Sequence, residues 1–134
     1  MPSNAYTAHI EASVLTAEPV ELVRTLYRGA LDAVADARAC VAAGDVAGRS
    51  AAVSKAVNIL RELAFSLKPE SEPGMARNLL ELYDYMQRRL LAAHLERSEA
   101  PLGEVTGLLA TLAEAWDQVE ATPEVESALL QRAG

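Results

Sequence analysis

Aromatic residues, cysteine and basic residues are scarce in this sequence, and each shortage excludes a class of protein. Aromatics make up 4% of the chain, and Ile and Thr are also few, so a large β-sheet is not expected. Cys40 is the only cysteine, which excludes an intramolecular disulfide and favours a reducing compartment. The formal charge of -7 argues against a nucleic-acid binder, because such a protein needs a basic surface to neutralise phosphates.

Long apolar runs are missing as well. No uncharged stretch approaches the roughly 18 residues of a membrane span, and the N-terminus lacks the basic start of a secretory signal. We therefore expect a soluble cytoplasmic protein that does not insert into a membrane.

What the chain does contain is typical of helices. Ala, Leu, Glu and Arg dominate, and apolar residues recur every three or four positions in four segments, at about 19–43, 46–67, 75–95 and 102–119. Pro19 suits a first helical turn, and Gly44 and Asp45 are expected to end the first helix and cap the second. Short connections between long helices predict an all-α, antiparallel up-down four-helix bundle.

The chain divides into three parts on this interpretation. Residues 1–17 form an N-terminal cap or lid segment, residues 18–121 form the bundle, and residues 122–134 form a tail. In the tail, Thr122 and Pro123 could begin a short helix that carries Val125, Leu129 and Leu130.

The sequence offers no support for catalysis, a metal or a cofactor. A metal site in a bundle would need Glu-x-x-His pairs, whereas Tyr6 precedes His9 by three residues and Leu91 precedes His94. There is no Gly-rich phosphate loop and no Gly-x-Ser-x-Gly elbow. Cys40 is expected to be a small buried side chain. We predict that the protein is not an enzyme; a bundle metalloprotein is a distant alternative.

Four local strings stand in a fixed order along the chain. They are residues 14–23 leading into Leu-Tyr-Arg-Gly-Ala at 26–30, residues 55–63, residues 78–90 with Leu-Tyr-Asp-Tyr at 82–85, and residues 104–109 followed by Ala-Trp at 115–116. Together they cover about 5–119, and the sequence resembles the flagellin export chaperone family, the FliS-like proteins. Glu18 departs from the family pattern, in which Ser is commoner, so Thr16 could cap the first helix instead. The tail beyond about residue 121 matches nothing in the family.

The resemblance implies a function in protein export. Members of the family bind the disordered C-terminal segment of newly made flagellin in the cytoplasm, prevent its premature polymerisation and keep it competent for the flagellar type III secretion apparatus. A component of the export gate is a second candidate partner, and a monomer or weak homodimer is expected. The alternative is a helical adaptor, or a bundle that binds a regulator, with a different protein client.

The apolar pattern suggests where a client could bind. The helices at 46–67 and 75–95 carry apolar arcs wider than one neighbour can cover. The candidates for a client-binding groove are Ile59, Leu63, Leu80, Tyr83 and Tyr85, with Asn58 and Asn78 as hydrogen-bonding groups. A place in the core is equally open for each apolar member, and a solvent-facing amide for each Asn. Tyr83 and Tyr85 are favoured as interface residues, and Tyr27 and Trp116 as core residues.

The N-terminal segment contributes apolar residues of its own. Tyr6, Ile10, Val14 and Leu15 give it enough apolar surface to fold over an empty groove. Together with the resemblance, this predicts a displaceable lid.

Overall fold

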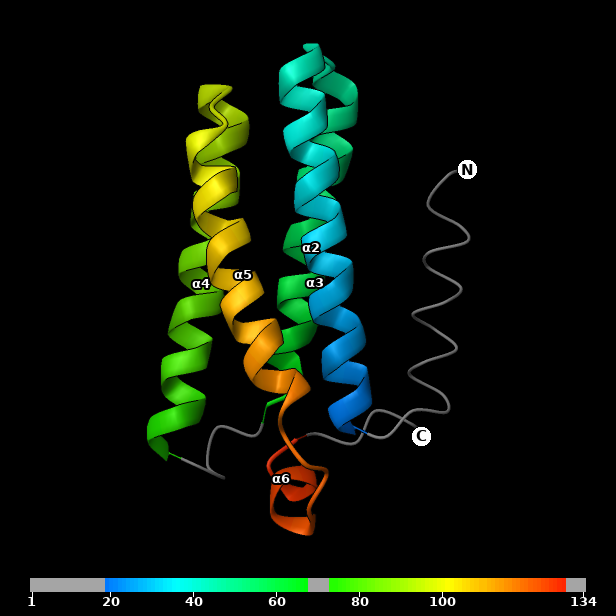
Figure 1. Ribbon diagram of the computed structural model, residues 1–134. Helices are drawn as coiled ribbons and strands as arrows, with labels where there is room; N and C mark the ends of the chain where they lie inside the picture. Colours follow the sequence, from blue (N-terminus) through cyan, green and yellow to red (C-terminus); the bar gives the residue numbers. More distant parts are fainter. Residues whose placement is uncertain (1–18, 68–72, 130–134) are drawn as a thin grey trace.

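The structure, a computed structural model, describes residues 19–67 and 73–129, and every regular element in these ranges is a helix (Figure 1). Four helices are long and the fifth is short: α2 (Pro19–Ala43), α3 (Val46–Phe65), α4 (Pro73–Glu96), α5 (Ala100–Asp117) and α6 (Pro123–Ser127). The only pairing of extended backbone in the described ranges is an isolated antiparallel bridge between Leu67 and Leu129. The all-α prediction is confirmed.

The long helices form a closed ring. Helix α2 contacts α3 and α5, α3 contacts α4, and α4 contacts α5, while the backbones of the diagonal pairs stay apart. Consecutive helices run in opposite directions, as an up-down bundle requires, and α6 lies beyond the end where α2 begins (Figure 1). The chain thus has the predicted bundle architecture, with a small element at one end.

The turn between α2 and α3 follows from two residues. Gly44 adopts a φ of 70°, the left-handed conformation that a glycine enters at no steric cost. The amide of Asp45 then donates to the carbonyl of Cys40 at 2.9 Å, which closes the last turn of α2 in a Schellman motif. The Asp45 carboxylate accepts from the amide of Gly48 at 2.9 Å and caps α3, as predicted.

The end of α4 uses the same geometry without a glycine. Arg97 has a φ of 54°, and the amide of Ser98 donates to the carbonyl of Ala93 at 3.0 Å. Two predicted helix ends differ from the structure: α3 ends at Phe65, two residues early, and α5 ends at Asp117 instead of 119. Leu67 has left the helix because its backbone takes part in the bridge to Leu129.

The core is built from the predicted stripes of the four long helices. Its largest fully buried side chains include Tyr27, Leu26, Leu60, Leu63, Tyr83, Met86, Leu90, Leu102 and Leu109. Tyr27 is therefore a core residue, as expected. Trp116 is only partly buried, because it lies one residue before the end of α5 and no further helical turn covers it. Cys40 is also half-buried, beside the turn at Asp45, and not enclosed as the sequence predicted.

The cap of α3 gives a first testable prediction. Replacing Asp45 by Ala leaves the amide of Gly48 without its acceptor, so the free energy of unfolding should fall by about 1 kcal/mol in urea titrations. Asp36→Ala is the matched control, because Asp36 is an exposed acidic residue in the middle of α2. An equal loss in both variants would mean that charge, and not capping, sets the effect.

Candidate functional site

Helix α4 has two flanks, and the flank that faces α5 is polar. Arg89 donates from Nε to Glu104 Oε1 at 2.7 Å, and the Tyr85 hydroxyl donates to the other oxygen of Glu104. These hydrogen bonds, that of Tyr85 first, hold the pKa of the Glu104 carboxyl below its usual range, and the same bond raises the pKa of Tyr85. Tyr85, predicted for the groove, thus joins α4 to α5.

The other flank of α4 faces α3 and is mixed: apolar side chains lie on it, and the exposed Asp84, which pairs with an arginine one turn later, lies between them. Arg49 of α3 donates from Nε to His94 Nδ1 at 3.1 Å, which identifies the side of α4 that faces α3. Leu91 lies one turn before His94 on that side, and Leu80 lies three turns further back. Leu91 is 49% exposed, and Leu80 is half-buried against the core.

Two further exposed apolar residues lie near the Arg49–His94 end of this flank. Leu95, four residues after Leu91, is 79% exposed. Val46 lies one turn before Arg49 in α3 and is also exposed. We call the set Val46, Leu80, Leu91 and Leu95 the α3–α4 strip. Large exposed apolar side chains on one flank are typical of a surface that another molecule covers.

Three of the predicted groove residues lie elsewhere. Ile59, Leu63 and Tyr83 are buried in the core, and Tyr83 is only 1% exposed. Tyr83, the favoured interface residue, offers almost no surface to a partner in this structure. The physical reason is its position: it shares the core-facing stripe of α4 with Met86 and Leu90.

Tyr83 instead forms a buried pair with Tyr27 of α2. Their hydroxyl oxygens are 2.6 Å apart and their ring centroids 6.4 Å apart, and Trp116 lies against Tyr27 at 6.5 Å. Each hydroxyl thereby gains a partner inside an apolar core. Burial raises the pKa of Tyr83 to about 12 and raises the pKa of Tyr27 as well.

The remaining predicted residues are dispersed. Asn58 and Asn78 are exposed on α3 and α4. The lid residues Tyr6, Ile10, Val14 and Leu15 lie outside the described residues. Of the predicted groove set, only Leu80 belongs to the α3–α4 strip, and the client contacts of all these residues stay predictions.

Sequence reasoning missed Val46, Leu91 and Leu95 as site residues. A signal was present, because Leu91 follows Leu80 by eleven residues, about three helical turns, and Leu95 follows Leu91 by one turn. Leu91 directly follows the buried Leu90, and Leu95 lies one turn after Leu91. This second line of apolar residues therefore runs beside the core stripe of α4. Phe65 and Met75 are also exposed, near the opposite end of the α3–α4 pair.

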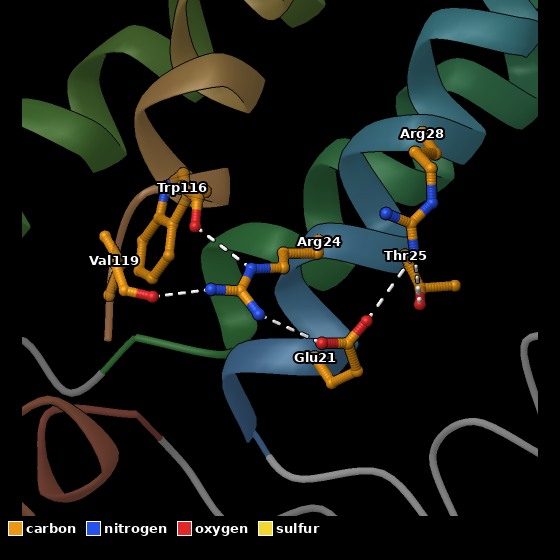
Figure 2. Close-up of polar contacts among 6 residues, drawn as sticks. All are labelled: Glu21, Arg24, Thr25, Arg28, Trp116 and Val119. Atoms are coloured by element: carbon orange, nitrogen blue, oxygen red, sulfur yellow. Dashed lines mark hydrogen bonds and ion pairs between the residues drawn. The ribbon is translucent and has the colours of Figure 1, made fainter. Parts of the chain in front are cut away.

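Arg24 connects α2 to the end of α5 (Figure 2). Its guanidinium donates to the carbonyl of Trp116 at 3.0 Å and to the carbonyl of Val119, and it pairs with Glu21 at 3.0 Å. Trp116 lies in the last turn of α5, whose free carbonyls carry the negative end of the helix dipole, so a guanidinium is favourable there. Val119 follows two residues after the helix ends. A second link joins the same helices near the other end of the bundle, where Arg38 pairs with Glu99.

The described part of the chain is also expected to lack a metal site and a membrane span. Within residues 19–67 and 73–129, no three His, Cys, Asp or Glu side chains are grouped as a metal site would need. Over the same ranges, none of the helices combines the length and the apolar character needed to cross a membrane.

Fold and surface together define a class of protein: a helical bundle with exposed apolar side chains, among them Leu91 and Leu95, on one of its long helices. The model of the family described as flagellar protein FliS matches residues 2–123. The chain belongs to this family, as the sequence resemblance indicated.

Named relatives support the same family. The chain is 43% identical over 111 residues to the flagellar secretion chaperone FliS of Salmonella typhimurium, a match that covers 82% of each chain. It is 36% identical over 115 residues to the protein of the same name from Bacillus subtilis, covering 86% of this chain and 85% of the relative. The relative from Escherichia coli is 34% identical over 117 residues, covering 87% and 86%. The family is thus one of flagellar secretion chaperones.

The buried tyrosine pair predicts an alkaline limit to stability. An unfolded tyrosine ionises near pH 10, whereas the folded pair stays protonated to about pH 12. A folded pKa raised above the unfolded value gives stability that is present below pH 10 and is lost as the pH rises towards 12. Urea titrations across this range should show the loss.

The control for this prediction removes both hydroxyls. Tyr27→Phe combined with Tyr83→Phe should be nearly neutral at pH 8, because neither partner is left unsatisfied, and should weaken the alkaline dependence. If the double variant lost stability above pH 10 as steeply as the wild type, other groups would be responsible.

Proposed function

We propose that this protein binds the disordered C-terminal segment of flagellin in the cytoplasm, prevents its premature polymerisation and aids its delivery to the flagellar type III secretion apparatus. The observation that carries the proposal is the family match over residues 2–123, together with relatives named as flagellar secretion chaperones. A component of the export gate is the proposed second partner, and the protein itself is proposed to be a monomer or a weak homodimer.

The α3–α4 strip is the surface that we assign to the client. A disordered amphipathic segment can fold into a helix as its apolar face covers a neighbouring helix pair. Leu91 and Leu95 offer exposed anchors one helical turn apart, and Leu80 continues the same flank. The net charge of -7 helps to keep a protein with such a surface soluble.

The polar links support this choice of flank. The α4–α5 seam is joined through Glu104, and the α2–α5 seam through Arg24 and Arg38. These links hold α5 to both of its neighbours. The α3–α4 strip can therefore be covered by a client without breaking them.

Titration with a synthetic flagellin C-terminal segment tests the proposed function. The mixture should show more helical circular dichroism than the sum of its components, because the segment folds as it binds. No binding, or binding without a gain of helix, would contradict it. Recovery of a different client from a flagellated cell lysate, without flagellin, would favour the adaptor alternative.

A pair of variants locates the contact. Leu91→Ala should weaken binding of the segment by about 1 kcal/mol or more in calorimetry, because it truncates an exposed anchor. Met75→Ala is the matched control: Met75 is 51% exposed on the same helix but lies at the other end. An equal effect of the two changes would argue against the strip as the main contact.

The lid remains a separate prediction, since residues 1–18 lie outside the described ranges. Removing the residues before Thr16 should tighten binding of the flagellin segment, because the client would no longer compete with Ile10, Val14 and Leu15 for apolar surface. Calorimetry on the shortened protein measures this. An unchanged or weaker affinity would contradict the lid.

A further inference from the structure

The segment from Thr122 to Leu129 closes one end of the bundle. Helix α6 lies at the end of the bundle where α2 begins (Figure 1). It contacts α2, and Leu129 forms the antiparallel bridge with Leu67 just after the end of α3. Leu129 is only 1% exposed and belongs to the same apolar core as the four long helices. We call this stretch the C-terminal segment.

The C-terminal segment is anchored mainly by one side chain. Helix α6 has five residues, and none of them is buried as a whole residue. Thr122 caps it by accepting from the amide of Val125 at 3.3 Å. A helix of this length does not persist in water by itself. Its conformation therefore depends on docking through Leu129, with Val125 half-buried against the core.

Docking of the segment carries an electrostatic penalty. Both carboxylate oxygens of Glu126 are buried and have no hydrogen-bond partner in the structure. A buried carboxylate without a donor is unfavourable, because it has lost its water and gained nothing in return. Undocking would return Glu126 to solvent, whereas Glu124, in the same short helix, is already exposed. Burial of the Glu126 carboxylate therefore destabilises the docked state of the C-terminal segment.

Arg24 limits how far this part of the chain can move. Its hydrogen bonds to the carbonyls of Trp116 and Val119 hold the chain against α2 up to residue 119 (Figure 2). The C-terminal segment begins three residues later. It can therefore leave the bundle end while α5 stays in place.

We propose that the C-terminal segment is a displaceable closure of the bundle end, kept weakly docked by the buried Glu126 carboxylate. Undocking exposes the apolar site of Leu129 and the backbone of Leu67. That site accepts an apolar side chain of an extended client segment, paired with Leu67 as Leu129 is now. This last step rests on the proposed function; the docking equilibrium does not.

Hydrogen exchange measures the docking equilibrium in the full-length protein. The amides of Glu126 and Ala128 are bonded within the segment at 2.9 and 3.0 Å, so they exchange when it undocks and unfolds. Glu126→Gln should slow their exchange by about fivefold to tenfold, because a neutral amide is less costly to bury than a carboxylate. Glu124→Gln removes the same charge from an exposed site and should change the exchange less than twofold.

Leu129→Ala gives the opposite test. Truncating the one deep anchor should speed exchange of these amides at least tenfold, while amides in the middle of α2 and α3 stay unchanged. Equal exchange in the Glu126→Gln and Glu124→Gln variants, or no effect of Leu129→Ala, would overturn the proposal.

Adding the synthetic flagellin C-terminal segment tests the client step. In the complex, the amides of Glu126 and Ala128 should exchange faster than in the free protein, and Glu126→Gln should bind the segment about threefold or more weakly than Glu124→Gln does. If the wild type bound the segment while these amides stayed protected, the client step would be wrong. If it bound no segment at all, the proposed function would fail, and the comparison of the two glutamate variants would still decide the docking equilibrium.

Discussion

The width of the apolar arc on α4 is the constraint on which the rest of this structure depends. In a four-member ring each helix contacts two neighbours, so only one stripe of it can face the core. On α4 that stripe is filled by Tyr83, Met86 and Leu90. Leu91 and Leu95 lie beside it and have nowhere to be buried within the bundle.

Polar contacts fix the sides of α4 that face α5 and the core. Glu104 holds Tyr85 and Arg89 on the α5 side of α4. The hydroxyls of Tyr27 and Tyr83 satisfy one another inside the core, across the diagonal of the ring. These contacts hold the α5 flank and the core side of α4, whereas the α3 flank has the contact from Arg49 to His94, beside the exposed side chains of Leu91 and Leu95.

The two proposed displaceable parts differ in their basis. The N-terminal lid rests on the apolar residues of the sequence and on the family resemblance. The C-terminal segment rests on geometry: one deep anchor at Leu129, a backbone bridge to Leu67, and a buried carboxylate without a donor at Glu126. In both cases an apolar surface would be covered by the chain itself until another polypeptide takes its place.

The sequence by itself determined the helices, their order and the antiparallel bundle. These follow from interactions over one or two turns: the apolar period of 3.6 residues, the glycine at 44, the cap at Asp45 and the start at Pro123. It also identified the family, because the strings that carry the resemblance are local.

Only the tertiary structure decided which side of each apolar arc faces the core. Periodicity places Tyr83 and Leu80 on neighbouring lines of one helix, but their burial depends on where α3 and α5 lie. The same reason explains Tyr85, whose partner Glu104 lies 19 residues away on another helix. It also explains the carboxylate of Glu126, whose burial depends on how the end of the bundle packs around it.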